Sequence, residues 1–407
     1  MTPDRPAPTA KPERFEIRVS ESDLADLRAR LANTRFAPDH HNDDWRYGVP
    51  TAELALWVAA WRDFDWRAAE TRINAFEHYR VTIDDVPIHF LHRRGRGPRP
   101  IPLVLTHGWP WTFWDWNATV GPLADPGAYG GDPADAFDVV VPSFPGFTYS
   151  TPLTRTDVGA FRTADLWVKL MTEMLGYGRF AAAGGDMGNI VTAQLGHAHT
   201  DKLIGIHLLG AIPLAPAAAL TPGPHGPWTL DWGFPKPSTP PHDPVLAAAP
   251  TSPPTTPSSH RVVHTVEPQT LAAALHDSPA GMMAWLLKAR RHWSDNRGDV
   301  REAFSEDFLL TTFSLYWLTG CLGSSIRAYR VGADHPWRPA HDRRPVVEAP
   351  TGITFFEYDQ TSRSRFWAAD YYNLVRTSYQ PRGGHFSPAE VPETVVSEIR
   401  ETFRALR

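Results

Sequence analysis

Residues 181–190, AAAGGDMGNI, place one aspartate among three glycines directly after a short apolar run. Gly184 and Gly188 stand two residues before and after Asp186, the spacing of a strand–turn–helix corner that presents a nucleophile. Such a corner needs glycines because strand and helix approach closely and its central residue adopts strained backbone angles. The residues alone also fit a plain glycine-rich turn in which Asp186 caps the helix.

The chain on both sides of this corner alternates strand, loop and helix patterns. Buried strands are predicted at 101–108, 136–146, 179–185 and 203–210, and a helix is predicted at 163–175. Strands that alternate with helices imply a mostly parallel, doubly wound sheet. A nucleophile corner within such a sheet predicts the α/β-hydrolase fold.

A change of composition interrupts this pattern after residue 211. Residues 211–259 are rich in proline and are expected to form an irregular surface loop, and several predicted helices follow. Strand and helix patterns then resume, with a strand at TGITFFEYD, a helical stretch before GGHF and a closing helix at 391–407. This order indicates a core that carries a helical cap. We therefore predict a disordered lead (1–14), an N-terminal extension (15–95), the first part of the core (96–215), the proline-rich loop and cap (216–340), and the second part of the core (341–407).

Composition excludes several function classes. The 407 residues carry a net charge of −5 at pH 7, so nucleic acid is not an expected partner. The longest apolar runs fall under half of the ~20 residues that a bilayer crossing needs, so no membrane anchor is predicted. The single cysteine, Cys321, and the absence of an apolar leader predict a cytoplasmic protein. Histidine pairs such as His40–His41 lack a complete ligand set, so neither a metal nor a cofactor is expected.

Two further motifs complete a candidate catalytic set. The loop THGWPW, residues 106–111, follows a predicted strand and would supply the Trp109 N–H to an oxyanion hole, together with the N–H of Met187. His385 in GGHF comes last in the chain, where the base of such hydrolases lies. The acid lies at the end of TGITFFEYD, where Glu357 and Asp359 share one face of an ideal strand. Periodicity therefore leaves both carboxylates open.

An aspartate nucleophile suits displacement at a saturated carbon. A serine that opened an epoxide would form an ether, which water does not readily cleave. A carboxylate forms an ester, which an activated water hydrolyses through an oxyanion-stabilised intermediate. Epoxide opening and dehalogenation both fit this chemistry.

From about residue 15 to its end, the chain resembles the microsomal and juvenile-hormone type of epoxide hydrolase, including soluble bacterial relatives. The resemblance rests on LANTR, DWRYGVP, LTHGWP, PSFPGF, GGDMGN, DSPAG, YWLTG, SSIRAY and RGGHF, in this order. It implies that Asp186 is the nucleophile and that His385 activates water. It also implies that Asp359, rather than Glu357, is the acid, and that Tyr329 of the cap protonates the epoxide oxygen.

The sequence departs from the family pattern at three places. The second cap tyrosine has no counterpart, and its position falls at His260, or at His264 if the alignment shifts. Met187 replaces an aromatic residue after the nucleophile, and Trp111 stands in a WPWTFW run where a WPGS-like run is usual, so we expect Trp111 to shape the substrate pocket.

The prediction is an epoxide hydrolase that converts a small-molecule epoxide to a vicinal diol through an aspartyl ester. A haloalkane dehalogenase-like enzyme is one alternative, although Met187 cannot supply the indole N–H that commonly binds the halide. A ligand-binding or biosynthetic relative with lost or redirected hydrolysis is the other. The assembly state is left open, and a homodimer is compatible with the sequence.

Overall fold

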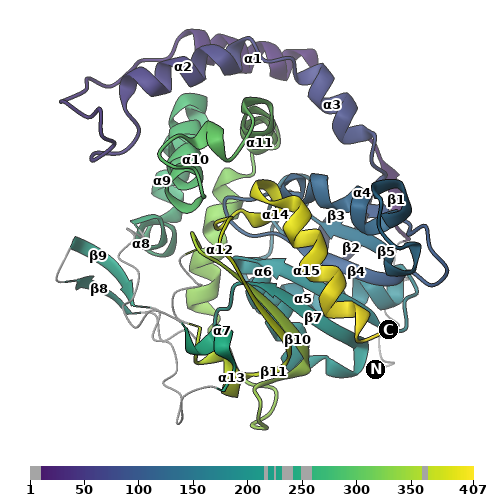
Figure 1. Ribbon diagram of the computed structural model, residues 1–407. Helices are drawn as coiled ribbons and strands as arrows, with labels where there is room; N and C mark the ends of the chain where they lie inside the picture. Colours follow the sequence, from purple (N-terminus) through teal and green to yellow (C-terminus); the bar gives the residue numbers. More distant parts are fainter. Residues whose placement is uncertain (1–10, 215–218, 224–225, 232–241, 249–258, 360–364) are drawn as a thin grey trace, which may run out of the picture.

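The computed structural model describes residues 11–214, 219–223, 226–231, 242–248, 259–359 and 365–407. Within these ranges, nine strands form one twisted sheet in the order β1-β2-β3-β5-β4-β6-β7-β10-β11 (Figure 1). The strands are β1 (Glu13–Phe15), β2 (His78–Ile83), β3 (Val86–Arg93), β4 (Ile101–Thr106), β5 (Phe137–Pro142), β6 (Phe180–Gly185), β7 (Leu203–Leu209), β10 (Val347–Phe356) and β11 (Tyr372–Gln380).

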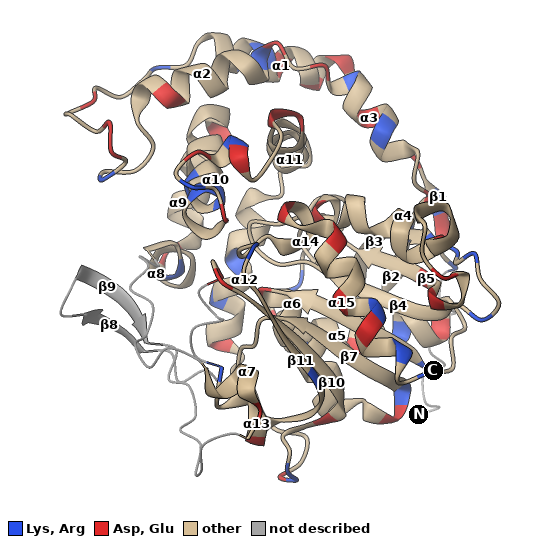
Figure 2. Ribbon diagram, viewed as in Figure 1, with Lys and Arg blue, Asp and Glu red and all other residues tan. Residues whose placement is uncertain are grey.

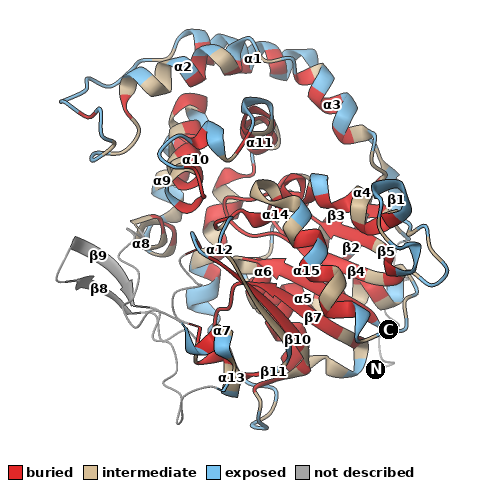
Figure 3. Cartoon of the chain, viewed as in Figure 1, coloured by how far each residue is buried: buried red, intermediate tan, exposed pale blue. Residues whose placement is uncertain are grey.

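The sheet is parallel from β5 to β11 and antiparallel at the β1 edge. Strands β2 and β3 form an antiparallel hairpin that turns at Asp84–Asp85, where both residues have positive φ, at 51° and 62°. The central strands are buried on both faces (Figure 3), as expected for a sheet between two helical layers. The predicted mostly parallel, doubly wound sheet of the α/β-hydrolase fold is confirmed.

Helices cover both faces of the sheet and place the two halves of the core around it. Helices α4 and α15 pack together on one face, and α5 and α6 pack together on the other (Figure 1). The helices and short helices of this core are α4 (Asn117–Ala124), α5 (Ala160–Lys169), α6 (Met187–Ala198), α7 (Pro244–Ala247), α13 (Ala368–Tyr371), α14 (Ser387–Glu390) and α15 (Pro392–Arg404).

The chain between β7 and β10 leaves the sheet and returns to it. It contains an antiparallel pair, β8 (Ala219–Gly223) with β9 (Gly226–Asp231), followed by a group of helices that lies beyond one edge of the sheet (Figure 1). These cap helices are α8 (Ser259–Val266), α9 (Pro268–Asp277), α10 (Pro279–Trp293), α11 (Glu306–Leu318) and α12 (Leu322–Asp334).

Three helices between β1 and β2 arch over the cap: α1 (Glu21–Ala32), α2 (Thr51–Arg62) and α3 (Trp66–Asn74) (Figure 1). Ser20 caps α1 by accepting the Asp23 N–H at 3.1 Å. The Trp61 indole donates to the Ser314 hydroxyl of α11 at 2.8 Å. Charged residues of both signs are interspersed along these helices (Figure 2), and Arg30 pairs with Asp277 of the cap. The extension is thus bonded to the cap as well as joined to the sheet.

The structure corrects three expectations. The disordered lead does not reach residue 14, because Glu13–Phe15 form β1 and pair with β2; residues 1–10 lie outside the described residues. The proline-rich loop includes the β8–β9 pair, while most of PTSPPTTPSS lies outside the described residues. The helical stretch expected before GGHF is a four-residue helix followed by strand β11. An edge strand of mixed polarity forms through pairing with β10, which its own pattern does not reveal.

In the part of the chain that the structure describes, no helix combines the length and apolarity that a membrane crossing requires.

A buried ion pair joins the cap to the core. Arg290 of α10 donates to both oxygens of Asp115, at 2.6 and 3.1 Å, and to the Pro110 carbonyl at 2.9 Å. Both charged side chains are at most 1% exposed. The guanidinium also lies 4.1 Å from the ring centroid of Phe386, next to His385. Because the pair is desolvated and bidentate, each partner depends on the other.

We expect Asp115→Ala to lower the free energy of unfolding by about 3–5 kcal/mol, because it leaves the Arg290 charge buried and unpaired. Urea unfolding measures this loss. The matched control is Glu77→Ala, which breaks the exposed Arg14–Glu77 pair and should cost less than about 1 kcal/mol. Equal losses in the two variants would show that the buried pair does not hold the cap.

Candidate active site

Asp186 lies at the corner between β6 and α6. Its backbone adopts φ 54° and ψ −122°, and α6 begins at the next residue, Met187. A side chain on Gly188 would place its Cβ 2.1 Å from the Thr106 carbonyl oxygen of β4, so only glycine lets the helix approach the sheet this closely. The corner therefore lifts the Asp186 carboxylate above the carboxyl edge of the strands, which is the geometry expected of a nucleophile.

His385 lies between two carboxylates. Its Nε2 is 3.2 Å from Asp186 Oδ2, and its Nδ1 is 3.5 Å from Asp359 Oδ1. Asp359 is buried, whereas Glu357 is exposed and makes no ion pair with His385. The choice between them was open because β10 ends at Phe356, so both carboxylates follow the strand and alternation no longer applies.

The loop after β4 reaches the other oxygen of the Asp186 carboxylate. The Trp109 N–H donates to Asp186 Oδ1 at 2.8 Å. His107 fixes this loop, because its Nε2 accepts the Phe144 N–H at 2.9 Å and its Nδ1 therefore donates to the Gly108 carbonyl at 3.0 Å. Burial lowers the pKa of His107 to about 4, so the ring is neutral. Met187 follows Asp186 and is half-buried at the start of α6.

Tyr329 of α12 faces the core from the cap. It lines a cavity of about 830 Å³ between core and cap, together with Met187, Ile190 and Arg261. Burial and the nearby Asp186 charge raise the pKa of Tyr329 well above its usual value, so its hydroxyl keeps its proton at neutral pH.

His260 and His264, on one face of α8, both reach this part of the protein. The His260 ring stacks on Trp109 at 5.3 Å and meets Tyr329 edge-on at 5.6 Å. Burial, with smaller effects of neighbouring cations that include His385, lowers the pKa of His260 well below 6.5. The His264 ring centroid lies 4.6 Å from that of Trp109 and 5.0 Å from that of Tyr329. Its Nε2 accepts the Trp285 indole N–H at 3.0 Å.

Trp111 packs against His385 and does not line the 830 Å³ cavity. It is fully buried, and its ring meets His385 edge-on at 5.8 Å and Phe386 at 5.9 Å. The Trp293 ring, at the end of α10, also meets the His385 ring edge-on, with 5.3 Å between the ring centroids. The sequence did not single out Trp293, because nothing in ARRHW distinguishes a tryptophan at the site from one in the core.

The charge state of His385 follows from its two neighbours. Burial alone lowers its pKa, but the contacts with Asp186 and Asp359 outweigh burial and raise the pKa from 6.5 to about 10. The resting site therefore holds an imidazolium between two carboxylates. Its stabilising effect on the fold is complete below the unfolded pKa of about 6.5 and is lost as the pH rises through about 10.

We expect the His385 imidazole to titrate near pH 10 in the resting protein, and to titrate at lower pH in Asp186→Asn, which removes one of the two carboxylates. Titration of ¹⁵N-labelled histidine by NMR, with the signal assigned through His385→Gln, measures both values. An unchanged pKa in Asp186→Asn would contradict the pairing described above.

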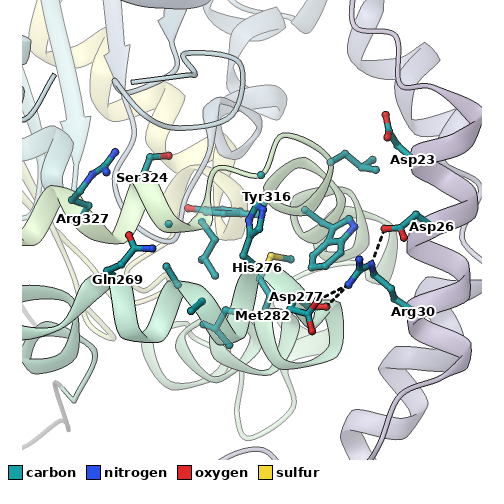
Figure 4. A pocket seen from close by; sticks show the side chains of 18 residues that line it. Asp23, Asp26, Arg30, Gln269, His276, Asp277, Met282, Tyr316, Ser324 and Arg327 are labelled. Atoms are coloured by element: carbon teal, nitrogen blue, oxygen red, sulfur yellow. Dashed lines mark hydrogen bonds and ion pairs between the residues drawn. The ribbon is translucent and has the colours of Figure 1, made fainter. Parts of the chain in front are cut away.

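A second hollow lies away from these residues. It has a volume of about 590 Å³ and lies between α1 of the extension and the cap helices (Figure 4). Arg30 crosses its rim between Asp26 and Asp277. Tyr316 lines its inner side and donates to the Trp111 carbonyl at 3.0 Å. None of the predicted catalytic residues lines this hollow.

The described residues contain no cluster of three or more His, Cys, Asp or Glu side chains that could hold a metal ion.

Two family models match the chain: "Epoxide hydrolase N terminus" over residues 12–116 and "alpha/beta hydrolase fold" over residues 101–373. A putative epoxide hydrolase of Stigmatella aurantiaca is 36% identical over 395 residues, which cover 97% of this chain and 85% of that protein. Epoxide hydrolase 1 of Oryctolagus cuniculus is 29% identical over 406 residues, covering 95% and 87%. The structure of Aspergillus niger epoxide hydrolase superposes with a TM-score of 0.77 at 23% identity, covering 98% and 97%.

The sheet order and the strand–helix corner, together with these matches, define an α/β hydrolase. Within that class, the chain belongs to the epoxide hydrolase family. It is therefore an enzyme of the hydrolase type, and the family predicted from its motifs is confirmed.

Proposed function

We propose that the protein hydrolyses an epoxide to a vicinal diol through an ester on Asp186. The observation that carries the proposal is the opposed pair of contacts on this carboxylate. The Trp109 N–H holds Oδ1 at 2.8 Å, and His385 Nε2 lies 3.2 Å from Oδ2. One oxygen is thus held by an oxyanion donor, while the other faces the residue that activates water. The names of the relatives support the same reaction.

In the first step, Asp186 Oδ2 attacks a ring carbon and the carbon–oxygen bond of the epoxide breaks. The Tyr329 hydroxyl gives its proton to the departing alkoxide, which suits a phenol that is protonated at neutral pH. Esterification removes the negative charge of Asp186, so the pKa of His385 falls. The imidazolium proton then returns to the Tyr329 phenolate through solvent, and His385 becomes a neutral base.

In the second step, His385 takes a proton from water, and the hydroxide attacks the Asp186 carbonyl carbon. The Trp109 N–H, already on Oδ1, stabilises the oxyanion that develops there, and the Met187 N–H is the proposed second donor. Asp359 stabilises the imidazolium. Collapse of the intermediate expels the diol, which takes the proton from His385. The Asp186 carboxyl then gives its proton to His385, and the resting pair is restored.

His260 is the proposed second donor to the epoxide oxygen. Its ring is neutral, so one ring nitrogen carries a proton, and it lies against Trp109 and Tyr329. The charge of His385 acts on it, which places it within electrostatic reach of the catalytic set. His264 is the alternative donor: its Nε2 accepts the Trp285 indole N–H, which leaves the proton on Nδ1, a buried atom with no hydrogen-bond partner among the described residues.

We expect Asp186→Asn to show no turnover, because an amide is not a nucleophile at saturated carbon. His385→Gln should accumulate a covalent adduct, in which the protein mass increases by the mass of the epoxide, because the ester forms but no base activates water. Chiral analysis of diols from a broad epoxide panel and intact-protein mass spectrometry measure the two results. Full activity of Asp186→Asn, or no adduct in His385→Gln, would refute the mechanism.

The same substrate panel tests the two alternative functions. Halide release without diol formation would indicate dehalogenation, and binding without turnover would indicate redirected function.

We expect Tyr329→Phe to slow ester formation by about 100-fold, as the loss of a general acid does. His260→Phe should slow it by about 10-fold, the effect of one hydrogen bond to a developing charge. Single-turnover measurements in the His385→Gln background isolate this step. His276→Phe, which changes an exposed histidine of the cap, is the matched control. An unaltered rate in His260→Phe would remove His260 from the reaction.

A further inference from the structure

We propose that Glu390 is the positioning residue that holds His385 in place for the hydrolysis of the ester. This inference rests on the proposed function, since it concerns the base of the second step. Glu390 is the last residue of the short helix α14, which follows the histidine loop, and it touches none of the proposed reacting atoms.

Glu390 binds the histidine loop on both sides of the base. Its Oε1 accepts the Phe386 N–H at 2.8 Å, and its Oε2 accepts the Gly384 N–H at 3.0 Å. The same Oε2 accepts the Asp295 N–H at 2.7 Å, just beyond the end of α10. One carboxylate therefore joins three backbone segments: the residue before the base, the residue after it, and the cap.

The cap completes this contact from its own side. The His385 N–H donates to the Trp293 carbonyl at 2.7 Å. The Asp295 carboxylate is 3% exposed, accepts the Gly383 N–H at 3.1 Å and pairs with Arg382 at 2.5 Å. Residues 382–386 thus bind residues 293–295 through backbone hydrogen bonds and through the carboxylates of Asp295 and Glu390. We call this set of contacts the histidine clamp.

The clamp explains the second glycine of GGHF. A Cβ on Gly384 would lie 2.7 Å from the Trp293 carbonyl oxygen and 2.9 Å from the Ser294 Cα. The loop can therefore approach the cap only without a side chain at this position. This close approach is what brings the Gly384 N–H within reach of Glu390.

The position of His385 decides whether it can act as a base. Its ring must face a water beside the Asp186 ester while keeping its contact with Asp359, which is 3.5 Å long. A displacement of about 1 Å costs on the order of 100-fold in rate when reacting groups depend on alignment. The attack on the epoxide depends on Asp186 and Tyr329 instead. Loss of Glu390 should therefore impair the second step selectively.

The test compares the two chemical steps in Glu390→Gln. The amide keeps one acceptor oxygen and turns an NH₂ group toward backbone N–H donors, so the clamp loses at least one bond. Measurements are made at about pH 8.5, because burial raises the pKa of Glu390 to about 7 and the carboxylate is then ionised. Ester formation should stay within about 3-fold of wild type, while ester hydrolysis slows by about 100-fold and the adduct accumulates.

Two further variants keep the result interpretable. Asp295→Asn weakens the clamp from the cap side and should also slow hydrolysis of the ester without slowing its formation. It takes the place of Glu390→Gln in the test if that variant does not fold. Glu393→Gln changes an exposed glutamate in the first turn of α15 and should leave both rates unchanged. Unchanged hydrolysis in folded Glu390→Gln would overturn the proposal. So would an equal loss of both steps, because that pattern indicates general destabilisation.

A crystal structure of Glu390→Gln separates this inference from the proposed function. We expect the His385 ring to move by about 1 Å relative to wild type. A ring that stays 3.2 Å from Asp186 would overturn the positioning role, whatever reaction the enzyme catalyses. A displaced ring in a protein that forms no ester with any epoxide would instead support the positioning role and refute the proposed function.

Discussion

The strained corner at Asp186 is the constraint on which the rest of the site depends. Its backbone angles, φ 54° and ψ −122°, cost on the order of 1–3 kcal/mol in a residue other than glycine. The surrounding packing must supply that energy, and it does so where α6 meets β4 across Gly188. The same corner turns one carboxylate oxygen to the Trp109 N–H and the other to His385. The sheet, the Trp109 loop and His385 therefore converge on Asp186.

The cap is joined to this corner through α10. Arg290 anchors the helix to Asp115 beside the oxyanion loop, and the residues that follow the helix bind the histidine loop. One joint pairs the fully buried Asp115 carboxylate with a guanidinium, and the other binds the part-buried Glu390 carboxylate to backbone N–H groups. Charge burial is costly unless it is compensated, so these joints favour a single arrangement of cap and core. Tyr329, on another helix of the cap, is thereby held within reach of the Asp186 charge.

Local sequence signals were sufficient for much of the fold and for part of the site. The corner at Asp186, the loop at Trp109 and the late His385 each carry a short motif, and the structure brings all three together. Asp359 could not be separated from Glu357 by periodicity, because the strand ends at Phe356 before either carboxylate.

Other features depend on tertiary contacts that leave no local pattern. The stretch before GGHF has a helical pattern, yet most of it forms β11, because an edge strand of mixed polarity is defined by its partner β10. Arg290 and Asp115 are 175 residues apart in the chain, so their pairing has no spacing to recognise. Glu390 was overlooked for a different reason: its partners are backbone N–H groups, which every residue except proline possesses.

The histidine clamp also bears on how this enzyme could acquire new substrates. The cap lines the cavity, so exchanging it between relatives is an obvious route to altered selectivity. The end of α10, however, is bonded to the loop that carries His385, and the contact between Asp295 and Glu390 spans 95 residues of the chain. The end of α10 and the His385 loop therefore form one structural unit. A chimera that takes the cap from one parent needs residues 382–390 from the same parent.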